Sequence, residues 1–182
     1  MFDYVRYRSG ASDERALSLA RMQVPAHLLA KTDGVDLNSL LSEWRWLVPE
    51  NLKPTVTATF GDLFLRDEAG KVHFLDSLYG ELKYVANSQA DFEQLCEDRD
   101  FRRKYFQSFF VMEMRKMHGE LEVGECYSCD IPPTLGAQLE PEEFERTDLE
   151  AHLSILGQVH RQTKHLPVGN RIDRVNNNVS AC

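Results

Sequence analysis

Residues 61–76 constrain the fold of this 182-residue chain more than any other stretch. Two apolar runs, 63–65 and 72–75, flank a short polar tip at 67–70. Runs of this length around a short tip that contains glycine are typical of a β-hairpin. Gly70 stands where such a connection often needs a positive φ, which glycine adopts at little cost. The sequence therefore predicts a β-hairpin.

The apolar residues of this hairpin would lie on both of its faces. With a four-residue tip, Leu63 and Leu65 would share one face with Val72 and Phe74, because side chains alternate along a strand. The remaining apolar residues of the two runs would lie on the opposite face. This distribution predicts a central pair of strands that is covered on both sides.

The rest of the chain alternates between helical and extended patterns. Asp36, Ser88 and Thr147 are the expected N-caps of three of the helices. In the longest helix, Phe101, Tyr105, Phe109 and Met112 would form one stripe of a core face, although such a stripe could also line a ligand groove. The expected helices cover 13–24, 26–31, 37–48, 89–95, 101–118 and 148–166, and the further expected strands cover 55–60, 81–86 and 125–131.

This order of elements predicts an α+β fold, in which a largely antiparallel meander of about four to five strands packs with N-terminal and C-terminal helices. We expect a single domain over 1–169 and a disordered polar tail over 170–182, which includes three consecutive asparagines.

The apolar fraction of 42% and the charged fraction of 27% are those of an ordinary globular protein. The chain has neither a signal-peptide pattern nor an apolar run long enough for a membrane span, so we expect a cytoplasmic protein.

The net charge of −8 argues against a general nucleic-acid binder, because phosphate contacts need clustered Lys and Arg. An acidic chain could bind a basic partner, although mild acidity also serves solubility alone. The sequence thus leaves the partner open while making direct binding of nucleic acid an unfavourable hypothesis.

Cys126 and Cys129 have the spacing of metal or redox cysteines. A structural zinc site usually needs a second such pair, and a redox pair usually opens a helix, whereas these residues lie in an expected strand. On the last helix, His152 and His160 would lie about 80° apart and His165 a further 140° around. They do not reproduce the i, i+4 spacing of a helical zinc site, so we interpret them as packed or surface histidines.

Asp62 and Asp76 bracket the hairpin and could form a carboxylate pair, although acids at strand ends are usually turn-formers. No phosphate-binding loop, dinucleotide-binding glycine pattern or nucleophile elbow is present in the sequence. We therefore expect no cofactor, no metal site and no catalytic residues.

Three blocks of sequence resemble a known family. The first block combines residues 46–49, 61–64, 74–76, 80–82 and 85–88; the second combines 124–128 and 131–136; the third is 152–160. In this order they are similar to the C-terminal domain of bacterial immunity proteins that neutralise DNase effectors of type VI secretion. The family was long catalogued as a domain of unknown function. The resemblance covers 37–167, and the helices from Val24 onward are weakly similar to the GAD-like domains associated with glutamate-tRNA amidotransferases.

The resemblance implies a non-enzymatic protein that binds and blocks a secreted toxin, possibly a basic nuclease. Two alternatives remain: a small-ligand or regulatory binding domain with a pocket between sheet and helices, and an enzyme that uses Asp62, Asp76 or the histidines. For the toxin-binding surface we expect acidic loops beside the sheet, with Phe144 as an anchor or, alternatively, as a core residue. The candidate residues are Glu140, Glu142, Glu143, Phe144 and Glu145, followed by Asp67 and Glu68 at the hairpin tip.

Overall fold

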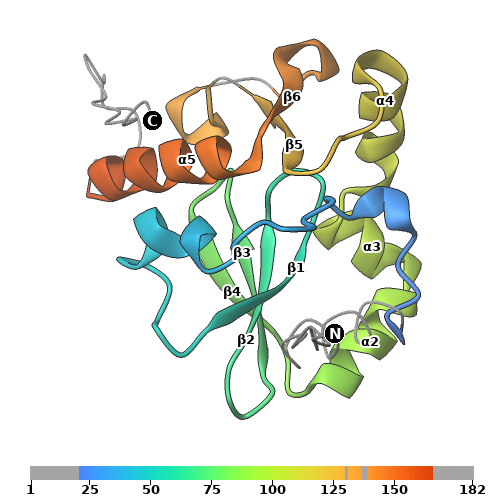
Figure 1. Cartoon of the computed structure of the whole chain (residues 1–182), viewed down its shortest axis with the longest axis vertical. Helices are drawn as coiled ribbons and strands as arrows, with labels where there is room; N and C mark the ends of the chain where they lie inside the picture. The colour runs from blue at the N-terminus through green and yellow to red at the C-terminus, as the bar shows by residue number, and fades with distance from the viewer. Residues whose placement is uncertain (1–20, 130, 137–138, 166–182) are drawn as a thin grey trace, which may run out of the picture.

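The computed structural model describes residues 21–129, 131–136 and 139–165, so the helix expected over 13–24 falls mostly outside these ranges and the expected tail falls outside them entirely. Figure 1 shows the arrangement of the elements. Its strands are β1 (Lys53–Thr57), β2 (Leu63–Arg66), β3 (Val72–Asp76), β4 (Glu81–Ala86), β5 (Glu125–Cys129) and β6 (Phe144–Asp148). Its helices are α2 (Gln89–Glu97), α3 (Arg99–Tyr105), α4 (Ser108–His118) and α5 (Leu149–Thr163), with 3-10 turns η1 (Ala26–Leu28), η2 (Ser39–Trp44), η3 (Pro133–Leu135) and η4 (Pro141–Glu143).

The α+β class and the antiparallel meander are confirmed. Strands β1 to β4 pair in sequence order, and β2 and β3 are the central pair. Strand β5 does not extend this meander; it pairs with β6 in a separate two-stranded sheet. The sequence analysis assigned the region of β6 to a polar loop and a helix start, because β6 has a single buried residue, Phe144, and exposes most of the others.

The hairpin is confirmed, but the expected distribution of its side chains between the two faces is wrong. Leu63 pairs with Leu75 and Phe64 with Phe74, so Phe64 and Phe74 share a face. The connection has five residues rather than four, because the backbone N–H of Lys71 donates to the Asp67 side chain (2.8 Å) and lengthens the turn. One additional residue moves every side chain of the second strand to the other face. Both faces of the hairpin are nevertheless buried, as expected.

The helix over 101–118 is wrong as a single element. Helix α3 ends at Tyr105 and α4 begins at Ser108, and Gln107 between them has φ 48° and ψ 40°, in the left-handed region. This break changes which side chains face the core. Phe106, Val111 and Met114 are buried, whereas Phe109, Met112 and Met117 are exposed.

The helix starts were partly predictable. The Ser88 hydroxyl caps α2 by accepting the Asp91 N–H (3.1 Å), as expected. Helix α5 is capped by Asp148 and not by Thr147, because Thr147 is still paired with Cys126 in the β5–β6 sheet. The expected helix over 37–48 is only the six-residue 3-10 turn η2.

One hydrophobic core runs through these elements. Its centre is Phe64 on β2, whose ring lies 5.0 Å from that of Phe74, 4.7 Å from that of Phe92 and 5.0 Å from that of Phe106. Helices α2 and α3 thereby pack beside the sheet, whereas α4 contacts η1, η4 and β6. Helix α5 and η2 lie together at one end of the sheet (Figure 1). None of the helices within the described ranges is long and apolar enough to cross a membrane.

Candidate functional site

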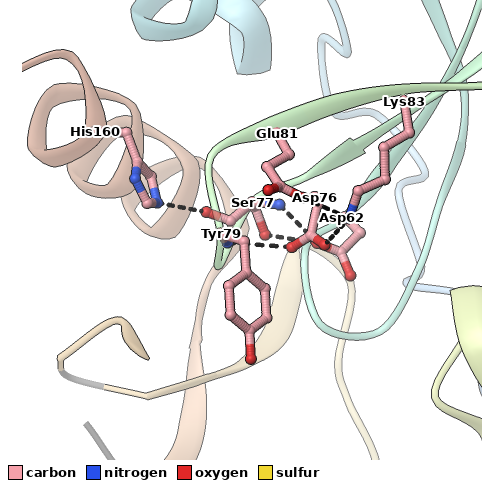
Figure 2. Close-up of polar contacts among 7 residues, drawn as sticks. All are labelled: Asp62, Asp76, Ser77, Tyr79, Glu81, Lys83 and His160. Carbon is pink, nitrogen blue, oxygen red and sulfur yellow. Dashed lines mark hydrogen bonds and ion pairs between the residues drawn. The ribbon is translucent and has the colours of Figure 1, made fainter. Parts of the chain in front are cut away.

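The sequence offers Asp62, Asp76, His152 and His160 as candidate polar residues. In the structure they lie where the β2–β3 hairpin ends and α5 crosses it. The pairing of Leu63 with Leu75 brings Asp62 and Asp76 to the same end of the hairpin. Asp62 is 2% exposed, and its Oδ1 accepts the backbone N–H of Ser77 (2.8 Å) and the Ser77 hydroxyl (2.9 Å), as Figure 2 shows. Asp62 therefore holds the turn that follows β3.

Burial, and to a smaller extent the nearby charge of Asp76, raise the pKa of Asp62 to about 7. The two hydrogen bonds from Ser77 and the charge of Lys83 oppose this shift without cancelling it. Removal from water disfavours the ionised carboxyl group more than two hydrogen bonds stabilise it. Asp62 is therefore largely protonated below neutral pH.

Asp76 has a different environment, although it closes the same turn. Its Oδ1 accepts the Tyr79 N–H (3.1 Å), and its Oδ2 lies 3.0 Å from Nζ of Lys83. Lys83 also pairs with Glu81 at 2.7 Å (Figure 2). Burial lowers the pKa of Lys83, but the hydrogen bonds and charges of Glu81 and Asp76 outweigh it and raise the pKa overall. Thus the two aspartates do not share a proton or a ligand; each has its own partner.

Two histidines of α5 reach the same residue, Ser77. His152 lies between two hydroxyls, with Nδ1 2.7 Å from Ser128 Oγ and Nε2 3.4 Å from Ser77 Oγ. Two turns further along, His160 Nε2 lies 3.1 Å from the Ser77 carbonyl oxygen. We call Asp62, Ser77, Ser128, His152 and His160 the Ser77 junction.

The imidazoles of the Ser77 junction fit against glycines in two turns. A Cβ on Gly61 would lie 2.5 Å from the His152 ring, and one on Gly80 would lie 2.6 Å from the His160 ring. Burial lowers the pKa of His152 to about 4, against a small opposing effect of the Phe60 backbone. Burial also lowers the pKa of His160. Both rings are therefore neutral at pH 7.

The Ser77 junction does not have the order of a hydrolytic triad. In a triad the carboxylate orients the imidazole, which takes the proton of the serine. Here Asp62 accepts the Ser77 hydroxyl directly, so the serine stands between the acid and His152. Ser77 is fully buried, and Asp62 and His152 are 2% exposed. The arrangement therefore joins α5 to the hairpin and has no access for a substrate.

The remaining sequence candidates lie apart from this junction. Cys126 and Cys129 are both buried in β5, and within the described ranges no cluster of three or more His, Cys, Asp or Glu side chains could hold a metal ion. Burial raises the pKa of Cys126 well above its ordinary value. His165 is exposed. These cysteines are thus packed thiols in this structure.

The candidate toxin-binding residues occupy two distant sites. Phe144 is 3% exposed and packs edge-on against Phe60 and Phe110, so it is a core residue and not an exposed anchor. Its neighbours Glu140, Glu142, Glu143 and Glu145 are exposed. Asp67 and Glu68 lie at the tip of the β2–β3 hairpin, at the opposite end of the molecule from β6 (Figure 1). The two acidic sets therefore do not form one continuous surface.

Two serines, Ser77 and Ser128, and a cavity beside η1 carry no functional signal in the sequence. The serines are ordinary in sequence, and only the tertiary pairing of β3, β5 and α5 brings them to His152. The cavity is lined by residues from five separate segments, and no sequence motif connects them.

Comparison with known proteins gives one family. Residues 86–160 match the family model described as T6SS immunity protein Tdi1, C-terminal. This match is less than half of the chain, and it confirms the resemblance that the sequence blocks carried. The weaker GAD-like similarity of the N-terminal part stays a prediction.

The Tdi1 match begins at the end of β4 and ends on α5, so it includes His152 and His160 but not Asp62 or Ser77. No curated protein matches the chain. Among solved structures, the crystal structure of Atu4351 from Agrobacterium tumefaciens has the same fold, with 16% sequence identity, a TM-score of 0.55, and an alignment that covers 80% of each chain.

Proposed function

We propose that this protein is an immunity protein, which binds a toxin effector of a type VI secretion system and neutralises it. The observation that carries the proposal is the match of residues 86–160 to the Tdi1 family model. The matched segment contains α2 to α4, both strands of the small sheet and most of α5. In this proposal the protein acts by binding and not by catalysis.

The chemistry of the described residues supports a binding role. Two groups with strongly shifted pKa values, Asp62 and His152, are buried and bonded to their neighbours in the Ser77 junction. Perturbed groups in an enzyme site usually face an open cleft. Here they stabilise the contact between α5 and the hairpin, which leaves the surface loops for recognition.

We propose a nuclease as the class of toxin. A nuclease binds phosphates, so its active surface carries Lys and Arg. An inhibitor with a net charge of −8 would be attracted to that surface and could cover it. In this proposal the protein touches the nuclease and not the nucleic acid, and it acts in the cytoplasm, where the toxin would reach its substrate.

The exposed glutamates at 140–145 are the first proposed contact. They occupy η4 and the start of β6, and Phe144 fixes this segment by packing against Phe60. A rigid segment with exposed carboxylates would present its charge without a large loss of side-chain freedom. Asp67 and Glu68, at the other end of the molecule, are the second candidate.

The proposal predicts that a neighbouring gene encodes the nuclease, and the binding test uses that gene's product, purified as a catalytically inactive variant. Reversal of Glu142 and Glu143 to Lys should slow association about three- to tenfold at low salt, and the difference should shrink as salt approaches about 1 M, where the Debye length is only about 3 Å. The control is the double variant Asp67→Lys, Glu68→Lys, which changes the charge by the same amount at the hairpin tip. Association rates would be measured by stopped-flow fluorescence.

The possible outcomes test the immunity function separately from the proposed contact surface at 140–145. If the wild-type protein neither binds the inactive variant nor protects DNA from the active nuclease, the immunity proposal fails. If the wild-type protein binds but both double variants lose the same rate, general charge attraction is responsible and the loop at 140–145 is not the contact. A larger loss in the 142/143 variant supports the proposed surface.

A further inference from the structure

A cavity of about 340 Å³ lies between η1, the end of α4 and β5, and none of its lining residues belongs to the Ser77 junction. Its volume falls at the lower end of the range for small-molecule sites, about 300–1,000 Å³. The cavity is lined by Ala26, His27, Leu29, Lys31, Thr59, Arg115, Glu120, Leu121 and Tyr127. Lys31 and Glu120 are exposed at its edge, whereas Thr59 and Tyr127 are buried.

The charged groups around the cavity leave an excess of one positive charge. Lys31 and Arg115 are cationic, and Glu120 is paired with Arg115. Burial lowers the pKa of His27, and the charge of Arg115 lowers it further, so this imidazole is neutral at pH 7. The lining residues therefore carry a positive excess although the chain as a whole has a net charge of −8.

Several hydrogen-bond donors of the cavity are not fully used by the protein. Lys31 Nζ donates to the Leu121 carbonyl oxygen (2.8 Å), which leaves two of its three protons for another acceptor. Arg115 has five N–H groups, of which Glu120 accepts from one nitrogen.

The other walls are apolar or already satisfied. Leu29, Leu121 and Ala26 contribute aliphatic surface. Burial raises the pKa of Tyr127, so its hydroxyl stays protonated and donates to the Gly119 carbonyl oxygen (2.5 Å). The aromatic ring of Tyr127 is therefore fixed and can contact an apolar group.

We propose that this cavity binds a carboxylate attached to an apolar body, with Lys31 and Arg115 as its cationic partners and Leu29 and Tyr127 against the apolar part. One excess positive charge matches a singly charged carboxylate better than a doubly charged phosphate. The pairing of Glu120 with Arg115 already places one carboxylate at the rim. The ligand is either a free organic acid or the carboxylate of a peptide, and both present the same group.

The experiment titrates the full chain with benzoate at constant ionic strength, followed by backbone amide NMR. We expect saturable shifts that include the amides of Lys31, Leu121 and Tyr127. Benzamide, which has the same shape without the charge, should bind at least about tenfold more weakly, because a charge-assisted hydrogen bond contributes roughly that factor. Inorganic phosphate should also bind more weakly than benzoate.

Two variants test the named residues. Lys31→Met should weaken benzoate binding by about tenfold. Lys116→Met is the control, because Lys116 lies on α4 next to Arg115 but does not line the cavity. The amide spectra show whether each variant is folded before its titration is used.

A short peptide that ends in a free carboxylate, compared with its C-terminal amide, distinguishes the two sources of ligand. Binding of benzoate alone identifies a small-acid site, and binding of the acidic peptide identifies a site for a partner segment. The proposal is overturned if benzoate and benzamide bind equally, if the peptide and benzoate both give no saturable shift, or if Lys116→Met weakens binding as much as Lys31→Met. The test is independent of the toxin and therefore of the proposed immunity function.

Discussion

The β2–β3 hairpin and the α3–α4 pair are both rich in large apolar residues, but they use them differently. In the hairpin, Leu63, Phe64, Leu65 and Leu75 are all fully buried. In α4, Phe109 is 75% exposed, and Met112 and Met117 are also exposed. The apolar content of a segment therefore predicts which residues are buried only where its backbone conformation can also be predicted, because the backbone sets the direction of each side chain.

The conformation of Gln107 causes this difference. A continuous helix would continue the stripe of Phe101 and Tyr105 into α4. The left-handed φ of Gln107 ends α3 and starts α4 with a new phase. As a result Phe106 packs against Phe64, and Phe110 packs against Phe60 at 5.5 Å, while Phe109 points away from the core.

The largest expected effect comes from matched truncations in the two regions. Phe64→Ala should lower the free energy of unfolding by about 3–5 kcal/mol, because it leaves a cavity among five rings. Phe109→Ala should change it by less than about 0.5 kcal/mol, because this ring is exposed. Urea unfolding followed by tryptophan fluorescence measures both values.

A Phe64→Leu variant keeps this comparison useful if Phe64→Ala does not fold, since it retains most of the volume. It should still lose more stability than Phe109→Leu. Equal losses in the two regions would mean that Phe109 is covered in solution, for example by another copy of the chain, and would contradict the contrast between hairpin and helix.

Much of the fold could be predicted because its signals are local. The hairpin, the strand order and the Ser88 cap follow from short patterns that tertiary contacts do not override. The hairpin register was missed because one side-chain hydrogen bond, from the Lys71 N–H to Asp67, lengthened the turn by a residue. The break at Gln107 was missed because residues 101–118 contain neither glycine nor proline to indicate a helix end.

The candidate site could be predicted only in part. Sequence spacing indicated Asp62, Asp76, His152 and His160 as candidate residues. It favoured packed or surface histidines for the last two, and both are packed in the structure. It could not predict that both histidines reach Ser77, since residues 77 and 152 are far apart in the chain and only the packing of α5 onto the hairpin end brings them together. The cavity beside η1 has the same origin in tertiary packing.

The second-largest expected effect is the pH dependence of stability that arises at the Ser77 junction. The folded-state pKa of Asp62, about 7, lies above its ordinary value of 3.8, so the folded protein binds more protons and loses stability as pH rises between about 4 and 7. The folded-state pKa of His152, about 4, lies below its ordinary value of 6.5, so stability rises with pH between about 4 and 6.5. The two slopes oppose each other and nearly cancel in the wild type.

Single variants should separate the two slopes. Relative to wild type, Asp62→Asn should make stability rise with pH between about 4.5 and 6.5, and His152→Gln should make it fall, each by up to about 1.4 kcal/mol per pH unit. Urea unfolding at several pH values measures the slopes, and only the change of slope is compared, because each substitution also changes stability uniformly. Parallel curves for all three proteins would contradict the buried, coupled placement of the two groups.

The smallest effect tests the break between α3 and α4 directly. Gln107→Gly should raise the free energy of unfolding by about 0.5–1 kcal/mol, because a non-glycine residue in the left-handed region costs roughly 1 kcal/mol and glycine adopts it freely, at some cost in unfolded-state entropy. Gln94→Gly is the matched control, since Gln94 is exposed within α2, where glycine should lower the stability by about 1 kcal/mol. Opposite signs for the same substitution would confirm that position 107 interrupts the helix in solution. Destabilisation by both would instead favour a continuous helix over 101–118, and with it the burial of Phe109 that the sequence pattern predicted.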